Sequence, residues 1–573
     1  MQAWEFAIAY HEETKHHYRR FARSAGYMDW SNQPDPFRRY AGCDVLALAH
    51  SAVDDGPAYA QLFQPGAIAP VPVNRESISA LFEYALALSA WKEFHGARWA
   101  LRINPSSGNL HPTEGYLVGG PVAGWVDAPG VFHYAPKAHA LEQRATIPAP
   151  SWKLLVAGFP LGTFFVGMTS IHWREAWKYG ERAYRYCQHD AGHALAAVAL
   201  SAAMNGWSMH PLPEVSDDTI ADLLGLSRAS DFVDAEREAP DLIVAVIPDR
   251  VAGADFPSAL TESARDLTPT FAWHGRANRL STDHVNWELI DAVDDACRKS
   301  TCANLAIAQT NVPALGPRSE LTRHHDVPLK VSVDFGNPTV RVRRTGEHTE
   351  CGVPARRIVR QRRSAVAMDG QTSISAAAFY AMMDRVMPRY DRAPWNALGP
   401  PVCVHLALFV HRVTGVDPGL YFLVRDAGRC AELKSAMNPN WEWECPDGCP
   451  SDLPLFRLTR GDFRTLAVQV SCTQDIAGDG AFSCGMIAEF ERPLQEYGAW
   501  FYRRLFWETG VIGQVLYLES EAAGIRATGI GCFFDDPVHE VFGLKGRAWQ
   551  SLYHFTVGGP VEDARLTTLP AYA

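Results

Sequence analysis

The sequence contains one internal repeat, and this repeat limits the chain to folds built from two similar halves. The segment that begins at Ala183 (AYRYCQHDAGHALAAVALSAAMNGW) aligns without a gap with the segment that begins at Phe501 (FYRRLFWETGVIGQVLYLESEAAGI). Similarity at one constant offset is typical of a duplicated structural unit, and the long ungapped register disfavours the alternative of two unrelated alanine-rich helices. Two further matches keep this offset, and a third lies upstream in the same order: Asp217-Asp218 with Asp535-Asp536, Gly225-Leu226 with Gly543-Leu544, and Pro129–Phe132 with Pro418–Tyr421.

Each copy predicts the same local structure around one long helix. Residues 194–204 and 511–522 are small or apolar on most faces, which indicates helices that are buried on all sides. Gly206 and Gly524 follow these helices, where a left-handed C-cap is needed. A strand that ends in a Pro-Gly turn is expected before each helix, and a second helix with an acidic start after it. We therefore predict an α+β fold made of two fused, similar domains.

The repeat also divides the chain. We predict an N-terminal extension over residues 1–70, a first domain over 71–250, a linker with peripheral structure over 251–355 and a second domain over 356–573. The linker is polar and punctuated by proline and glycine, and it contains one predicted helix, Trp287 to Arg298.

The composition disfavours several classes of function. A net charge of -11 and a pI near 6.0 argue against nucleic acid or an anionic membrane surface as the main partner. No run of about eighteen apolar residues exists, so no transmembrane helix is expected. The first residues lack the features of an export signal, so we expect a cytoplasmic protein whose 12 cysteines are reduced thiols.

The first candidate binding segment, the Ser-Ser-Gly loop, lies in the first copy within RINPSSGNLHPTEGYLV. Two hydroxyls, a glycine and an amide stand side by side, and such a loop offers many small donors and acceptors to a flat heterocycle with carbonyl edges. An ordinary turn is the alternative interpretation. The candidate residues are Pro105, Ser106, Ser107, Gly108 and Asn109.

Two further candidate segments lie in the second copy. Arg360, Arg362 and Arg363 precede Ser364, and clustered guanidinium groups beside a hydroxyl suit a phosphate, although a solvated basic face is the alternative. In RATGIGCFFDD, the glycines of the Gly-Ile-Gly segment let the backbone approach a ligand closely. The candidate residues of that segment are Gly529, Ile530 and Gly531.

Each copy lacks the binding segment that the other copy keeps. The constant offset places Pro211 where the second copy has Gly529, and proline has no N–H and a fixed φ. Conversely, the second copy has PRYDRAPWNALGPPVCVHL where the first copy has the Ser-Ser-Gly loop. We therefore predict one site to which both copies contribute.

In combination, these segments resemble the nitroreductase-fold flavoproteins, specifically the SagB/ThcOx-type dehydrogenases. Members of this family are α+β proteins with a mixed sheet flanked by helices, and they are usually homodimers that bind FMN at the subunit interface. The resemblance covers both copies but not the linker, and it implies an intrachain pseudo-dimer. Because the copies complement each other, we expect one hybrid FMN site instead of two. The matching segments are Pro105–Pro112, Lys178-Tyr179-Gly180, Asp190–His193, Arg362-Arg363-Ser364 and Gly529-Ile530-Gly531.

The resemblance also assigns roles to residues of the candidate segments. Arg362 and Ser364 match phosphate and ribityl contacts, with Arg363 between them, and Arg565 matches a C-terminal phosphate contact. The Ser-Ser-Gly loop matches the segment that lies against the flavin ring from the opposite subunit. The Gly-Ile-Gly segment matches the loop beside the ring.

Lys178 and Tyr179 match a Lys-Tyr pair that assists proton removal in azoline dehydrogenases of this family. A lysine is expected to lower the pKa of a neighbouring tyrosine and so to make it a general base. A surface lysine beside a packed tyrosine is the alternative. His193 is expected to cap a helix or to pack in the core, with a catalytic role as the alternative. Cys532 is expected to be a small buried residue, with a redox-active thiol as the alternative.

No metal site is predicted. His11, His16 and His17 lie in one expected N-terminal helix, and Cys445 and Cys449 bracket a Pro-Asp-Gly turn. Structural zinc needs four ligands with paired close spacings, and only this one cysteine pair is visible.

The sequence therefore predicts an FMN-dependent oxidoreductase that acts on a small molecule or a peptide-derived heterocycle. SagB-type dehydrogenation is the leading hypothesis. NAD(P)H-dependent reduction of nitro compounds or quinones is one alternative, and a non-catalytic flavin-binding or scaffold protein of a modifying complex is another. A monomeric pseudo-dimer or a weak homo-oligomer is expected, because the fused copies already supply each other's partner surface.

Overall fold

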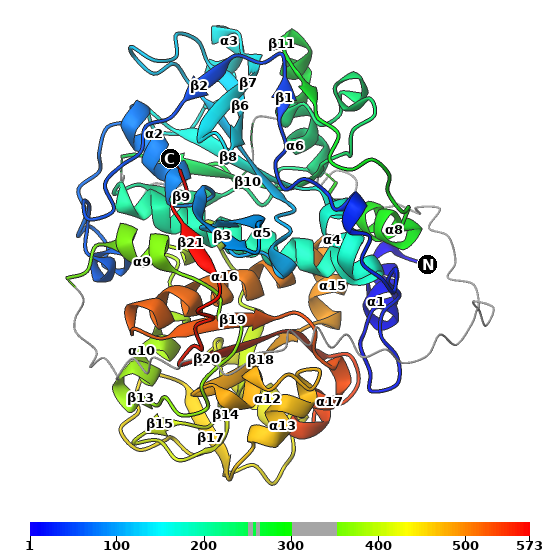
Figure 1. The fold of residues 1–573 in the computed structure, drawn as a ribbon, viewed down its shortest axis with the longest axis vertical. Helices are drawn as coiled ribbons and strands as arrows, with labels where there is room; N and C mark the ends of the chain where they lie inside the picture. Colours follow the sequence, from blue (N-terminus) through cyan, green and yellow to red (C-terminus); the bar gives the residue numbers. More distant parts are fainter. Residues whose placement is uncertain (250–255, 259, 261–263, 301–351, 573) are drawn as a thin grey trace.

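The computed structural model describes residues 1–249, 256–258, 260, 264–300 and 352–572 (Figure 1). Much of the predicted linker, including 301–351, lies outside the described residues. No helix in the described part of the chain is long and apolar enough to cross a membrane.

The described helices fall on both sides of the linker. The predicted linker helix is confirmed as α8, within one or two residues at each end. The helices are α1 (Ala3–Glu13), α2 (Arg75–Glu83), α3 (Ala149–Leu155), α4 (His172–Tyr179), α5 (Ala183–Met204), α6 (Asp217–Leu224), α7 (Ala264–Leu267), α8 (Glu288–Ala296), α9 (Ala355–Gln361), α10 (Ala376–Arg385), α11 (Trp395–Leu398), α12 (Cys430–Ala436), α13 (Arg464–Val470), α14 (Ile476–Asp479), α15 (Glu491–Tyr497), α16 (Phe501–Ala522) and α17 (Asp535–Phe542).

The strands form two large sheets and three small ones. They are β1 (Tyr40–Ala41), β2 (Val45–Ala47), β3 (Leu88–Phe94), β4 (Ala97–Arg102), β5 (Thr113–Gly119), β6 (Gly130–Ala135), β7 (Ala140–Thr146), β8 (Phe164–Ser170), β9 (Ser208–Pro211), β10 (Ala239–Ile247), β11 (Ala272–Trp273), β12 (Arg276–Ala277), β13 (Ile374–Ser375), β14 (Val404–Val410), β15 (Val413–Thr414), β16 (Gly419–Leu423), β17 (Leu455–Arg460), β18 (Phe482–Glu489), β19 (Arg526–Ile530), β20 (Trp549–Gly558) and β21 (Thr567–Leu569).

The two repeated helices, α5 and α16, pack against each other at the centre of the molecule (Figure 1). Both helices have 22 residues and are buried over almost their whole length, as the apolar pattern predicts. Gly192 and Gly510 lie where they cross, and a Cβ on either glycine would overlap the backbone of the other helix. Each helix ends before a left-handed glycine, Gly206 at φ 70° and Gly524 at φ 74°, which confirms the predicted C-caps.

The two large sheets have the same strand order. The first sheet contains the path β7-β6-β5-β8-β10-β9, with β11 and β2 beside β7, and the second follows β17-β16-β14-β18-β20-β19. Strand pairing within both is antiparallel, and one parallel bridge joins Ser364 to Ala527 on β19. Each Pro-Gly pair stands at the start of its strand, β6 or β16, and not at the end of one, because proline cannot donate to a ladder and suits the entry of a strand.

Each sheet lies between the central helix pair and an outer layer of short helices. Residues of α3, α6 and α7 cover the outer face of the first sheet, and residues of α12, α13 and α17 cover that of the second. The predicted acidic helices are α6 and α17, and both end at a left-handed glycine, Gly225 and Gly543. The expected α+β architecture of two similar, fused units is therefore confirmed.

Both ends of the chain contact segments that are far away in the sequence. In α1, the Tyr10 hydroxyl donates to the carbonyl of Glu181 at 2.6 Å, and His11 Nδ1 lies 3.2 Å from the hydroxyl of Tyr502 in α16. At the other end, β21 pairs with β3 of the first half. The N-terminal extension therefore contacts both halves, and the C-terminal strand joins a hairpin of the first half.

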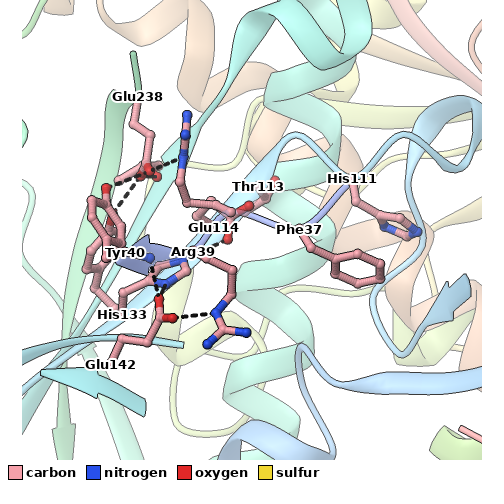
Figure 2. A network of polar contacts seen from close by, with 12 residues as sticks. Phe37, Arg39, Tyr40, His111, Thr113, Glu114, His133, Glu142 and Glu238 are labelled. Carbon is pink, nitrogen blue, oxygen red and sulfur yellow. Dashed lines mark hydrogen bonds and ion pairs between the residues drawn. The ribbon is translucent and has the colours of Figure 1, made fainter. Parts of the chain in front are cut away.

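A buried polar network joins the N-terminal extension to the first sheet (Figure 2). The His133 ring lies between Glu114 and Glu142, with each ring nitrogen 2.9 Å from a carboxylate oxygen. Glu142 also accepts the backbone N–H of Tyr40 at 2.9 Å and pairs with Arg39. Charged groups this deep are stable only when each is paired, so the network fixes residues near 38–40 on the sheet.

The raised pKa of His133 predicts that the folded protein loses stability in alkaline solution. Burial alone would lower the pKa of His133, but the hydrogen bonds and charges of Glu114 and Glu142 raise it to about 9. Because the folded pKa exceeds the unfolded value of about 6.5, this contribution, about 3 kcal/mol, is fully present below about pH 6.5 and is lost as the pH rises through about 9. Urea unfolding at about pH 6 and about pH 9.5 measures it. The free energy of unfolding of H133Q should depend less on pH than that of the wild type. H284Q, which changes an exposed histidine, is the control and should behave like the wild type. Equal pH dependence of all three proteins would refute this assignment.

Candidate functional site

The Ser-Ser-Gly loop rests on α4 and α5. The backbone N–H of Ser107 donates to both carboxylate oxygens of Asp190, at 3.0 and 3.1 Å, and its hydroxyl donates to one of them at 3.1 Å. Gly108 is exposed and has φ 59°, and a Cβ there would lie 2.6 Å from the hydroxyl of Tyr179 and 3.2 Å from Nζ of Lys178. The left-handed conformation favours glycine at this position, and the short distances show how closely Lys178 and Tyr179 approach the loop.

The buried network also holds this loop and α4 together. The Arg174 guanidinium donates to the carbonyl of His111 at 2.8 Å and to that of Asp35 at 3.1 Å, and it pairs with Glu114. In Figure 2, His111 and Thr113 lie on the same side of the network as Phe37. One arginine of α4 thus ties the helix that carries Lys178 and Tyr179 to the end of the loop.

The structure corrects the expected electrostatics of the Lys-Tyr pair. Burial, followed by the charge of Glu175, raises the pKa of Tyr179 well above its ordinary value, so the expected lowering by Lys178 is wrong. Burial lowers the pKa of Lys178, and Glu175 opposes this change. At neutral pH, Tyr179 is therefore a proton donor, and Lys178 gives up its proton more easily than an ordinary lysine.

A pair of buried carboxyl groups lies beneath the loop. Burial raises the pKa of Asp190 to about 7, and burial together with the nearby Asp190 raises the pKa of Glu175 well above its ordinary value. Oε1 of Glu175 lies 3.5 Å from the Ser106 hydroxyl, whereas its Oε2 is buried without a hydrogen-bond partner among the described residues. Both carboxyl groups therefore keep their protons at a higher pH than ordinary carboxyl groups do.

The Gly-Ile-Gly segment ends β19 and is surrounded by tyrosines. The Tyr517 hydroxyl accepts the backbone N–H of Gly529 at 3.0 Å and lies 3.0 Å from the hydroxyl of Ser364. Tyr186 of α5 donates to the carbonyl of Gly531 at 3.1 Å, and its ring centroid lies 4.5 Å from that of Tyr179. The candidate segments of both halves are thus brought together through tyrosine side chains.

Arg362 joins the arginine cluster to the strand before the Ser-Ser-Gly loop. Its guanidinium is buried, donates to the carbonyls of Arg102 and Ile103 at 3.0 to 3.2 Å, and lies 4.9 Å from the centroid of the Tyr517 ring. Burial, then the charges of Arg362 and Arg526, lower the pKa of Arg363 to about 10. Positive charge therefore exceeds negative charge here, which favours an anion such as phosphate.

Arg565 forms an ion pair that does not involve the arginine cluster. Its guanidinium pairs with Asp563 at 2.8 Å and lies 5.7 Å from the centroid of the Phe94 ring. Its predicted contact with a phosphate stays a prediction.

The assembled candidate residues are accessible from outside the protein. Gly108 and Ser364 are exposed, and Lys178, Tyr179 and both glycines of the Gly-Ile-Gly segment are partly exposed, so a ligand has access.

The comparisons with known proteins agree with this architecture. The model of the nitroreductase family matches residues 69–235. The structure also matches the crystal structure of an assigned nitroreductase from Anabaena variabilis with a TM-score of 0.65 at 20% identity, over 97% of this chain and 99% of that chain. The chain has the nitroreductase fold. No curated protein matches the sequence significantly.

Two further solved structures match parts of the chain with lower TM-scores. One is the Escherichia coli microcin synthetase McbBCD complex with truncated pro-MccB17 bound, with a TM-score of 0.26 at 21% identity over 44% of this chain and 93% of that chain. The other is an assigned nitroreductase in complex with FMN from Exiguobacterium sibiricum, with a TM-score of 0.20 at 12% identity over 36% of this chain and 87% of that chain.

The two segments that correspond to the Ser-Ser-Gly loop and the Gly-Ile-Gly segment in the opposite copies also meet each other. There α11 packs against β9, and a Cβ on Gly399 would lie 3.1 Å from the Pro211 ring. The proline that the sequence places opposite Gly529 is therefore in contact with the segment that replaces the Ser-Ser-Gly loop.

Several residues of the candidate site were missed in the sequence. Asp190 stood in a recognised motif but received no role, although a carboxylate inside an apolar helix is a usable signal for a perturbed group. The other residues belong to none of the matched motifs, and the fold brings them to the site: Glu175, Tyr186, Tyr517, Arg526 and Tyr553.

Proposed function

We propose that the protein is an FMN-dependent oxidoreductase with one hybrid flavin site between its two halves. The observation that carries this proposal is the convergence of the Ser-Ser-Gly loop, the arginine cluster and the Gly-Ile-Gly segment, linked by Tyr179, Tyr186 and Tyr517. The pseudo-dimer brings a loop of one half to a strand of the other. The contact of α11 with β9 supports the loss of the second site.

Different residues at this surface would bind different parts of FMN. Arg362, Arg363 and Ser364 would bind the phosphate and the ribityl chain, because positive charge is in excess there. The Gly-Ile-Gly segment would lie beside the ring, and the Ser-Ser-Gly loop would cover it. When bound, FMN would supply hydride transfer to or from a small molecule or a peptide-derived heterocycle.

The protein's own groups would handle the proton. Tyr179 keeps its proton at neutral pH and can donate a hydrogen bond, whereas Lys178, with its lowered pKa, can accept a proton in its neutral form. Asp190 accepts the backbone N–H of Ser107 and so positions the loop. Its pKa of about 7 means that its charge changes near neutral pH. This division of roles favours a dehydrogenase of the SagB type, in which proton removal accompanies hydride loss.

Substitution of the Lys-Tyr pair is expected to lower turnover without loss of flavin. K178M and Y179F should each reduce kcat about 10²- to 10⁴-fold, because each removes a group that transfers or holds a proton. Flavin content per chain should stay at the wild-type level. K153M, which changes an exposed lysine on α3, is the matched control. Full turnover in both site variants would contradict the assignment of this pair.

The direction of the reaction is tested by mixing the flavin-loaded protein with candidate donors without oxygen. An azoline-containing peptide should bleach the flavin absorbance, and NADPH should not. Bleaching by NADPH alone would replace this proposal by a nitro or quinone reductase. A protein that takes up no flavin would instead be a scaffold.

A further inference from the structure

Three residues from distant parts of the chain meet beside the Gly-Ile-Gly segment. They are His16, which follows α1, Cys472, which follows α13, and Cys532, which directly follows Gly531. Sγ of Cys532 lies 3.0 Å from Sγ of Cys472 and 3.6 Å from Nδ1 of His16. The three atoms all lie within 4.8 Å of one another.

The backbone delivers these side chains at some conformational cost. Cys472 and Thr473 are consecutive non-glycine residues with φ 53° and φ 56°, a left-handed conformation that ordinary residues rarely adopt. Such strain persists where the surroundings fix it, and it concentrates at functional sites. The side-chain amide of Gln474 donates to the carbonyl of Cys532 at 2.8 Å and so holds the two cysteine segments together.

His16 is held in place independently of its ring. Its backbone N–H donates to the Asp535 carboxylate at 2.8 Å, and Lys15 binds Asp536 at 2.8 Å. Asp535 in turn pairs with Arg182, whose guanidinium also reaches the carbonyl of Gly531 at 3.3 Å. An arginine beside the cluster would help to balance the charge of two thiolates.

We propose that His16, Cys472 and Cys532 bind a divalent transition metal of the zinc class. In a tetrahedral zinc site, a thiolate sulfur and an imidazole nitrogen lie about 3.5 Å apart and two sulfurs about 3.8 Å apart, so the cluster needs only a small separation of its sulfurs. Three protein ligands leave the fourth position for water or another exchangeable ligand.

The metal would fix the end of the Gly-Ile-Gly segment. Because Cys532 follows Gly531, the bound metal would tie this segment to the N-terminal extension and to the turn after α13. It would also explain why the extension reaches into the site of the second half. The inference stands on the three ligands alone and is independent of flavin binding.

Metal content of the purified protein tests the proposal. After loading with Zn²⁺ and dialysis, elemental analysis should find about one equivalent per chain in the wild type and less than about one tenth in C472S/C532S. H16Q should weaken binding about 10- to 100-fold or more. C445S/C449S, which removes the other close cysteine pair, should bind like the wild type. No metal in the wild type, or a loss confined to C445S/C449S, would overturn the proposal.

A second measurement uses the wild-type chain and so avoids variants that fail to fold. Co²⁺ added to metal-free protein should produce thiolate-to-metal charge-transfer absorption, and bound metal should protect Cys472 and Cys532 from alkylation, as read by peptide mass mapping. A Cys472–Cys532 disulfide in protein prepared without reductant, together with no Co²⁺ band after reduction, would show a redox pair in place of a metal site.

Discussion

The variant R362A is expected to lose its flavin. Arg362 is the buried member of the arginine cluster, and it joins the second half to the carbonyls of Arg102 and Ile103 in the first. Its removal takes away the proposed phosphate contact and loosens the strand before the Ser-Ser-Gly loop. A hydrogen bond from a charged donor contributes about 1.5–3 kcal/mol, so the affinity for FMN should fall at least about 10-fold and more where both effects combine.

The same substitution also costs stability, and the experiment separates the two effects. Two buried carbonyls lose their partner, so the free energy of unfolding without FMN should fall by about 3 kcal/mol. FMN binding is therefore titrated at a temperature where circular dichroism shows folded R362A. R357A, which changes an exposed arginine on α9 just before Arg362, should match the wild type in both measurements. A folded R362A that binds FMN with wild-type affinity would contradict the proposed phosphate site.

The second large effect is expected where the two central helices cross. A Cβ on Gly192 meets the backbone of Trp507, and a Cβ on Gly510 meets the backbone of His189 and His193. Alanine improves helix propensity by about 1 kcal/mol, but here it must push the two helices apart. We expect G192A and G510A each to lower the free energy of unfolding by about 3 kcal/mol or more.

A neighbouring glycine supplies the matched control. On α16, a Cβ on Gly513 meets only side chains, the nearest being the edge of the His193 ring at 2.6 Å, which can move. In denaturant unfolding, G513A should therefore lower the free energy of unfolding clearly less than G192A or G510A does. If G192A and G510A are as stable as G513A, the close approach of α5 and α16 does not hold the halves together.

The sequence predicts the central part of this fold because local rules and tertiary packing agree there. The apolar faces of α5 and α16, the glycines that end them and the paired aspartates that start α6 and α17 follow from residue type alone. The duplication then extends each of these predictions to the second copy. For the same reason, the complementary loss of the Ser-Ser-Gly loop and of Gly529 is visible in the sequence.

The parts that sequence analysis missed depend on long-range contacts. Nothing local indicates that β21 pairs with β3, or that His16 of the extension reaches Cys532. The pKa of Tyr179 was wrongly expected to fall, because its burial and the nearby Glu175 outweigh any effect of Lys178. Such electrostatic effects depend on depth and on neighbours that the fold supplies.

The number of FMN molecules released per chain tests the central claim most directly. The chain is saturated with FMN, freed of excess ligand and denatured, and the released flavin is measured against protein concentration. The hybrid site predicts about one FMN per chain, because at the equivalent place α11 packs against β9 and Pro211 replaces the glycine. About two per chain would show that both interfacial sites survive, and none would contradict a flavin site in this protein altogether.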